Sequence, residues 1–248
     1  MSKAPPMAGM AEFSFIPDLV PEPTATIGAE GHRTRMRQRL LKAGPDALAD
    51  YEMLEMILCI AVPRRDTKSL AKNLLVRFRT FGGVIGATVQ ELRSVDGVGE
   101  AGAAALKLVQ AAALRMMQQD LIGQPVLATW DKLTDYLTAA MGHERVEQFR
   151  VLFMDSRNRL LADEVQSIGT INHTPVYPRE VVRRCLELNA TAVLLAHNHP
   201  SGEPAPSRED IAMTAELVRV TGAMGIAVHD HVVIGRGKWV SFKTERLM

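Results

Sequence analysis

The chain has few of the features that mark secreted or membrane proteins. It contains only two cysteines, Cys59 and Cys185, in apolar periodic segments, so we expect buried thiols and no disulfide. No apolar run approaches the roughly 20 residues that cross a bilayer. The N-terminus lacks a charged start followed by an apolar stretch. These absences predict a cytoplasmic protein with no membrane partner.

The chain also lacks an excess of positive or negative charge. The chain has 29 basic and 28 acidic residues and a net charge of +1, so no overall basic field favours nucleic acid. The hydrophobic share of 47% and the charged share of 23% are ordinary for a globular protein. A length of 248 residues allows one or two domains, each with its own core.

Several catalytic motifs are absent as well. The chain has no His-Glu-x-x-His helix of a zincin and no Pro-Cys-x-x-Cys of a zinc deaminase. It also has no Gly-x-Ser-x-Gly elbow and no Walker loop. These classes of hydrolase and nucleotide-binding protein are therefore excluded.

The first half of the chain divides into a tail and a helical region. Residues 1–30 are proline-rich and show no sustained apolar period, which predicts a mobile tail. Residues 31–122 show helical periodicity, with apolar faces at 51–60 and 68–81 and an Ala/Leu-rich helix that ends near residue 119. We expect Gly82-Gly83 to end the second of these helices.

A glycine turn at Gly97-Val98-Gly99 resembles a helix-hairpin-helix element, in which backbone N–H groups approach a DNA phosphate. The same turn can simply join two packed helices, and the neighbouring Glu100 would repel phosphate. Arg35 and Arg39 lie one turn apart in the most basic stretch, which is either a solvated helix face or a phosphate contact. We therefore expect DNA binding to be weak and without sequence preference.

The second half alternates strands and helices. After a linker at 121–125, we expect helices at 131–140, 179–188 and 208–221. Strands are expected at 149–154, 160–166, 191–196, 226–234 and 239–242, the first two forming a hairpin. This alternation predicts a mixed sheet covered by helices, so the whole chain is of the α+β or α/β class.

A candidate metal site lies at the end of the strand at 191–196. His197 and His199 are two residues apart and can point to one face, and Asp210 follows in the first turn of the next helix. Two neutral imidazoles and one carboxylate form a ligand set for a catalytic zinc with one open position. Ser207 and Asp210 also have a purely structural explanation as a capping box.

These residues resemble the JAMM (MPN-plus) motif, His-x-His-x10-Asp with an embedded serine. Four short sequence motifs resemble the RadC family of bacterial proteins. They are Val176-Tyr177-Pro178-Arg179-Glu180, His197-Asn198-His199-Pro200-Ser201-Gly202, Pro206-Ser207-Arg208-Glu209-Asp210 and Asp230-His231. The similarity runs from about residue 31 to the C-terminus. It implies a three-layer α/β/α JAMM domain at 126–248, similar to cytidine deaminases, after a helix-hairpin-helix-like domain at 31–122.

The resemblance also implies roles for the site residues. His197, His199 and Asp210 would hold one zinc ion per chain, and Ser207 would stabilise an oxyanion. Glu164 matches the strand carboxylate that serves as general acid and base, whereas strand alternation points the adjacent Asp163 to the other face. For His173, His229 and His231, both a role behind the metal ligands and simple packing remain open.

Three functions follow as hypotheses. The first is a zinc-dependent hydrolase of the JAMM class that cleaves a peptide, isopeptide or related amide bond in a protein or other amide substrate. The second is a DNA-associated repair or recombination protein that uses the helix-hairpin-helix region, with the metal domain acting on DNA or a DNA-bound partner. The third is a metal-stabilised scaffold without catalytic activity.

Overall fold

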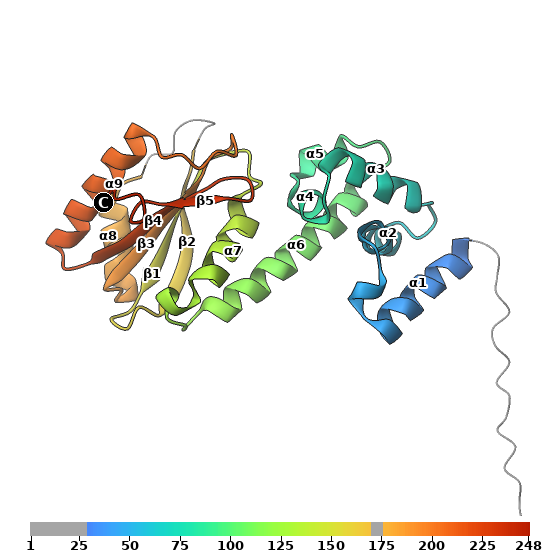
Figure 1. Cartoon of the computed structure of the whole chain (residues 1–248), viewed down its shortest axis with the longest axis horizontal. Helices are drawn as coiled ribbons and strands as arrows, with labels where there is room; N and C mark the ends of the chain where they lie inside the picture. The colour runs from blue at the N-terminus through green and yellow to red at the C-terminus, as the bar shows by residue number, and fades with distance from the viewer. Residues whose placement is uncertain (1–28, 170–175) are drawn as a thin grey trace, which may run out of the picture.

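The computed structural model describes residues 29–169 and 176–248, which form a helical N-terminal part and a sheet-containing C-terminal part (Figure 1). The helical part comprises α1 (Ala29–Ala43), the short turn η1 (Pro45–Ala47), α2 (Asp50–Ala61), α3 (Lys68–Phe78), α4 (Phe81–Gly86), α5 (Val89–Arg93) and α6 (Glu100–Leu121). The predicted helical region is confirmed. The tail predicted at 1–30 lies outside the described residues, apart from the two that begin α1.

The helical part has its own apolar core. Leu54 and Leu58 of α2, Leu74 of α3 and Leu106 of α6 are fully buried together. These residues recur at helical spacing, so each helix turns one apolar stripe inward.

The prediction that Gly82-Gly83 ends a helix is wrong. The helix α3 ends earlier, where Arg79 takes a left-handed backbone conformation with φ of 72°. The side chain of Thr80 then accepts a hydrogen bond from the N–H of Gly83, which caps a new helix. The glycines therefore lie inside α4, because a local cap outweighs their weak intrinsic preference against helix.

The long helix α6 joins the two parts of the chain (Figure 1). Its N-terminal half contributes Leu106 to the helical core, whereas Leu114 and Met117 pack against the core of the C-terminal part. The linker predicted at 121–125 is itself bonded to the sheet, since the Gly123 N–H donates to the Leu160 carbonyl at 2.8 Å.

A five-stranded mixed sheet forms the centre of the C-terminal part, as predicted. Its strands are β1 (Gln148–Met154), β2 (Leu160–Ile168), β3 (Ala192–Asn198), β4 (Ala227–Ile234) and β5 (Trp239–Ser241). The spatial order is β2-β1-β3-β4-β5. Only β3 and β4 run parallel, and the other neighbours are antiparallel.

Helices cover both faces of this sheet and give three layers. One face packs against α7 (Trp130–Met141), which follows the short turn η2 (Val126–Thr129), and contains Leu152 and Leu194. The other face packs against α8 (Pro178–Leu188) and α9 (Arg208–Ala223) and contains Val151 and Leu195. Successive residues alternate between the layers. Because β3 is buried on both faces, its first five residues, 192–196, form an uninterrupted apolar run.

The two thiols lie in different environments. Cys185 is buried between α8 and the sheet, while Cys59 on α2 is partly exposed, which corrects the expectation that both are buried. Both are free thiols. In the described part of the chain, no helix is both long and apolar enough to cross a bilayer.

Candidate metal centre

His197 and His199 lie at the C-terminal end of β3. His197 pairs with Phe149 of β1 and Val233 of β4, so it points into the layer of α8 and α9, and its side chain is 1% exposed. His199 follows the strand, and its backbone N–H donates to the Ile234 carbonyl at 2.9 Å. The alternation of the strand thus turns both imidazoles to the same side, as the sequence predicted.

The start of α9 brings Asp210 to these imidazoles. Ser207 is the N-cap of the helix, and its hydroxyl oxygen accepts the N–H of Asp210 at 3.1 Å. In return, the carboxylate of Asp210 accepts the Ser207 N–H and hydroxyl, each at 2.7 Å. The capping box is therefore present, and it fixes the orientation of the Asp210 carboxylate.

The three side chains converge on one point. The Nε2 atoms of His197 and His199 are 3.0 Å apart, and they lie 3.4 and 3.5 Å from the carboxylate oxygens of Asp210. In a tetrahedral zinc site with bonds of about 2.0–2.2 Å, ligand atoms lie about 3.3–3.6 Å from one another. The donor set and its spacing therefore fit a metal ion of this size.

Hydrogen bonds determine which ring nitrogen of His199 is free. Its Nδ1 lies 2.8 Å from the Glu203 carbonyl oxygen, which can only accept, so Nδ1 carries the proton. The neutral ring then has an unprotonated Nε2 facing the site.

A buried chain of hydrogen bonds determines the same for His197. The Thr214 hydroxyl donates its only hydrogen to the Asp210 carbonyl at 2.6 Å, so it must accept from Nδ1 of His231 at 2.6 Å. Complete burial lowers the pKa of His231 well below its usual value, so the ring is neutral and its Nε2 is an acceptor. That atom accepts from Nδ1 of His197 at 2.8 Å, so in a neutral His197 ring the nitrogen without a proton is Nε2.

Two unprotonated ring nitrogens 3.0 Å apart repel each other unless a proton or a cation lies between them. The carboxylate of Asp210 stabilises such a proton, because a protonated His199 ring can donate to it, and this interaction raises the pKa of His199. Burial alone would raise the pKa of Asp210, but its interactions with the two histidines in their protonated form outweigh burial and hold that pKa far below its usual range. The anionic carboxylate and the two lone pairs together form a pocket for positive charge.

The loop after His199 is held tightly against the turn between β4 and β5. Gly202 has φ of 89°, and its carbonyl accepts the Arg236 N–H at 3.0 Å. A Cβ on Gly235 would lie only 2.4 Å from that same carbonyl oxygen. Glycine at these two positions therefore lets the two backbones approach closely and fixes the path from His199 to Asp210.

Glu164 does not meet the histidines. It lies on β2 opposite Val151, on the correct face, but β1 separates β2 from β3. Its carboxylate binds the Arg184 guanidinium of α8, with Nε at 3.0 and 2.8 Å from the two oxygens. The hydrogen bond from Arg184 lowers the pKa of Glu164. The adjacent Asp163 does face the opposite layer, where it accepts a hydrogen bond from Arg150.

The carboxylate nearest in register to the histidines is Glu147, which the sequence reasoning missed. Phe149 pairs with His197, and continuing this antiparallel register by two residues puts Glu147 opposite His199 on the same face. The negative charge of Glu147 contributes to the raised pKa of His199. Asn198 holds this segment in place, because its side chain accepts the Gln148 N–H at 2.8 Å and donates to the Val146 carbonyl at 3.2 Å.

The remaining candidates have separate positions. His229 bonds to Asn158 in the β1–β2 turn at 2.6 Å, away from the metal ligands. Asp230 is buried and accepts the Ser241 hydroxyl at 2.5 Å and the Lys243 N–H at 3.0 Å, so it fastens β5 to β4. His173 lies outside the described residues.

Comparisons with known proteins agree with this architecture. Residues 127–247 match a family described as "RadC-like JAB domain", and residues 30–104 match a family described as "UPF0758 N-terminal". A "UPF0758 protein" of Rhodobacter capsulatus is 51% identical over 213 residues, which cover 86% of this chain and 100% of that protein. The chain therefore belongs to the RadC-like family of UPF0758 proteins, with a JAB domain that carries the His197–His199–Asp210 group.

Proposed function

We propose that this protein is a zinc-dependent hydrolase that cleaves an amide bond of the peptide or isopeptide type. The observation that carries the proposal is the convergence of two histidine Nε2 atoms and one carboxylate within 3.5 Å of one another. Nitrogen and oxygen donors in this number suit zinc and leave one position for water. A zinc ion here would lower the pKa of that water to about 7 and polarise a substrate carbonyl.

We assign the general base to Glu147 in preference to Glu164. A base must reach the proton that it removes, and Glu147 lies two residues before Phe149, the partner of His197, close enough for its charge to help raise the pKa of His199. Glu164 is held by Arg184, and its lowered pKa makes it a weaker proton acceptor. Glu147 would take the proton of the attacking water and deliver it to the leaving nitrogen.

Ser207 keeps its predicted role of stabilising an oxyanion. Its hydroxyl points to Asp210, so the O–H would rotate towards the substrate oxygen when a negative charge develops there. The backbone N–H of Ser207 continues to hold Asp210 after this rotation.

Metal analysis and a screen of fluorogenic amide substrates test the proposal. We expect one zinc per chain, lost when His197→Ala and His199→Ala are combined. Glu147→Gln should keep the zinc and lower turnover at least about 100-fold, whereas Glu164→Gln, the matched control, should stay active. Zinc retention in the double histidine variant would contradict the ligand assignment. A zinc-loaded protein that cleaves no amide would instead support a metal-stabilised scaffold.

DNA binding by the helical part is a second candidate function. Gly97 has φ of 88° and Gly99 is the N-cap of α6, so the predicted turn does present backbone N–H groups. However, Arg39 is bound to Glu52 at 2.8 Å, which removes half of the predicted pair of basic contacts.

We therefore expect weak, non-specific DNA binding. The affinity should fall only gradually with salt concentration, as expected for contacts to roughly two to four phosphates. A titration of duplex DNA across salt concentrations tests this expectation, and Glu100→Lys should tighten binding. Tight binding at high salt would make DNA the principal partner.

A further inference from the structure

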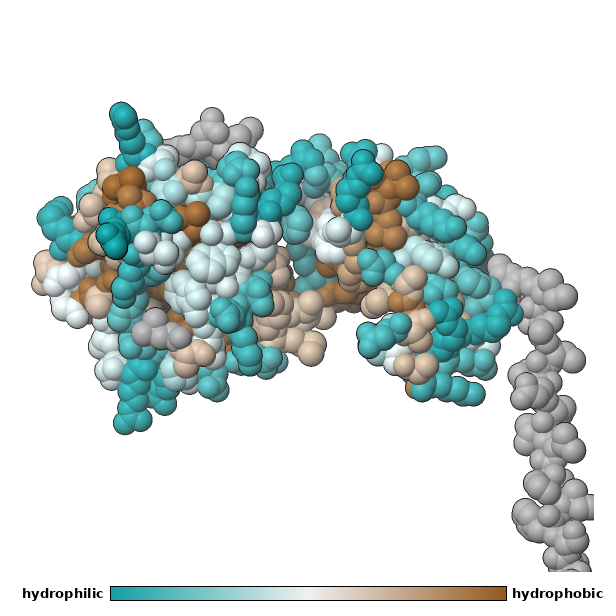
Figure 2. Space-filling model, in the orientation of Figure 1, coloured by the Kyte–Doolittle hydropathy of each residue, from teal (hydrophilic) through white to brown (hydrophobic). Residues whose placement is uncertain are grey.

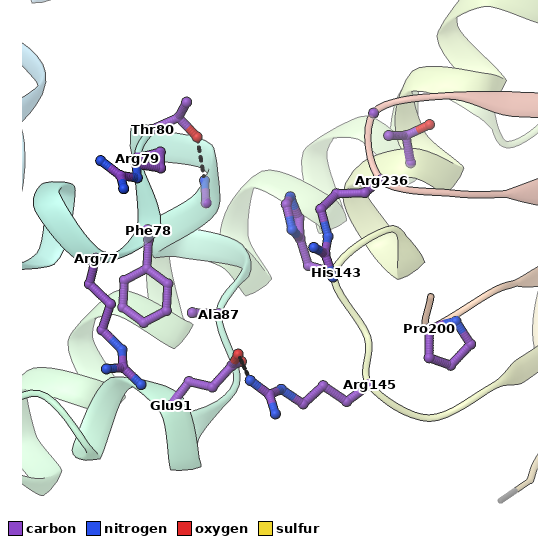
Figure 3. Close-up of a pocket in the computed structure, with 13 residues that line it drawn as sticks. Arg77, Phe78, Arg79, Thr80, Ala87, Glu91, His143, Arg145, Pro200 and Arg236 are labelled. Atoms are coloured by element: carbon purple, nitrogen blue, oxygen red, sulfur yellow. Dashed lines mark hydrogen bonds and ion pairs between the residues drawn. The ribbon is translucent and has the colours of Figure 1, made fainter. Parts of the chain in front are cut away.

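A cleft of about 1050 Å³ lies between the helical part and the sheet part of the chain. Figure 2 shows the hollow between the two lobes, with hydrophilic residues along its edges. Figure 3 shows its walls: Arg77, Phe78 and Arg79 come from the end of α3, and His143, Arg145 and Arg236 come from the sheet part. The volume is at the upper end of the range for ligand pockets in proteins, about 300–1,000 Å³.

The lining is strongly basic, although the whole chain is nearly neutral. It contains Arg77, Arg79, Arg145 and Arg236 and a single carboxylate, that of Glu91. Within the described residues, the side chains of Arg77, Arg79 and Arg236 make no hydrogen bond or ion pair, and Arg77 lies over the ring of Phe78. Three guanidinium charges therefore lack a carboxylate in the cleft.

The one carboxylate is fully used by its neighbours. Glu91 forms an ion pair with Arg145 across the two parts of the chain, and it also accepts the Thr88 N–H at 2.9 Å. Burial by itself raises the pKa of Glu91, but the bonds from Arg145 and Thr88 outweigh it and hold that pKa at about 2. Burial and the charge of Arg236 lower the pKa of His143, which is therefore a neutral hydrogen-bonding group in the wall.

The cleft borders the loop that carries the metal ligands. Pro200, which directly follows His199, forms part of its wall. Arg236 belongs to the β4–β5 turn, whose backbone is bonded to Gly202 of the same loop. Pro200, labelled in Figure 3, therefore links the wall of the cleft through the backbone to the metal ligand His199.

We propose that this cleft is a recognition site for an acidic polypeptide segment, next to the bond that the metal centre cleaves. Glutamate or aspartate side chains of the segment pair with Arg77 and Arg236, which approach it from opposite walls. The proposal deepens the proposed hydrolase function by naming its substrate class. Peptide binding can be measured without cleavage, so this proposal and the proposed hydrolase activity can be refuted independently.

The lining favours a polypeptide over a nucleic acid. Phe78, Ala87 and Pro200 alternate with the arginines, and such a mixture of apolar and cationic surface suits an acidic chain with some apolar side chains. A duplex is bound mainly through an extended row of phosphate contacts. Here the positive charges are confined to one concave site.

Fluorescence anisotropy with a labelled peptide of six consecutive glutamates tests the proposal on the full-length protein at low salt. The matched peptide of six glutamines should bind much more weakly. The double variant Arg77→Gln/Arg236→Gln should weaken glutamate-peptide binding about tenfold, since each exposed ion pair contributes a factor of about two to five. Arg115→Gln/Arg157→Gln removes the same charge from exposed positions outside the cleft and should leave the affinity unchanged.

Three results would overturn the proposal. One is absence of glutamate-peptide binding by the folded wild-type protein. Another is an equal loss of affinity in both double variants, because that would mean a general charge effect. The third is a labelled DNA duplex that binds more tightly than the peptide and loses affinity only in the cleft variant, which would assign the cleft to a nucleic acid backbone.

Discussion

Removing the Thr214 hydroxyl should weaken zinc binding, although this side chain supplies no ligand atom to the metal. The hydroxyl accepts Nδ1–H of His231, which in turn accepts Nδ1–H of His197. In Thr214→Val the buried Nδ1–H loses its acceptor, which costs about 1–3 kcal/mol. The metal-free protein can avoid this cost by moving the His231 proton to Nε2, which forces the His197 proton onto its ligand atom.

Zinc binding must then return both histidines to their original tautomers. The free energy that the metal-free protein gained by changing tautomers is therefore subtracted from the zinc affinity. A value of about 1.4 kcal/mol corresponds to a tenfold weaker zinc complex, at the low end of the roughly 10–100-fold known for groups behind metal ligands. Competition with a chromophoric chelator measures the affinity. Long-range ¹H–¹⁵N NMR spectra of the metal-free protein report which nitrogen of each histidine carries the proton.

Two variants control for general effects on α9. Thr221 is also buried in this helix and donates to the Leu217 carbonyl at 2.8 Å, so Thr221→Val removes an equivalent hydroxyl away from the site. It should lower stability by about 1 kcal/mol and leave zinc affinity unchanged. Thr214→Ser keeps the hydroxyl and should retain wild-type affinity. A folded Thr214→Val protein with unchanged affinity and tautomers would refute the reasoning.

Three further predictions concern stability. The pKa of Glu91 is lowered from 4.5 to about 2, so its contribution is complete above pH 4.5 and is lost as the pH falls towards 2. Urea unfolding at pH 7 and pH 3 should show about 1–2 kcal/mol more acid sensitivity in the wild type than in Glu91→Gln, after allowance for solvent screening. Gly235→Ala puts a Cβ 2.4 Å from the Gly202 carbonyl oxygen and should cost about 1–3 kcal/mol, whereas Gly222→Ala, in open space on α9, should be neutral or stabilising. Asp163→Ala leaves the Arg150 guanidinium without its buried partner and should lower the free energy of unfolding by about 3–5 kcal/mol, a loss that Asp163→Leu/Arg150→Met should largely recover in thermal melts.

The secondary structure was largely predictable because its signals are local. The two segments that flank a turn, 149–154 and 160–166, and the buried run at 191–196 correspond to β1, β2 and β3. The error at Gly82-Gly83 is also local in origin: two glycines usually end a helix, but the Thr80 cap starts a new one directly before them.

The proximity of the three candidate metal ligands was predictable for the same reason. His197 and His199 lie at the end of one strand, and Ser207 and Asp210 form a capping box. A segment of 14 residues therefore contains all three candidate ligands and the local structure that orients them. No contact with a distant element is needed to bring these side chains together.

Contacts between distant segments could be decided only by the tertiary structure. Strand alternation placed Glu164 on the correct face, but the order of the strands puts β1 between Glu164 and the histidines and brings Glu147, just before β1, towards the end of β3. In the same way, the hydrogen bonds of His231 and the presence of Arg77 and Arg236 on opposite walls of one cleft depend on how α9, β4 and the helical part pack. Sequence alone determines periodicity and local geometry, because both depend on residues a few positions apart. Strand register and the packing between the two parts of the chain depend on burying residues that lie far apart in the sequence.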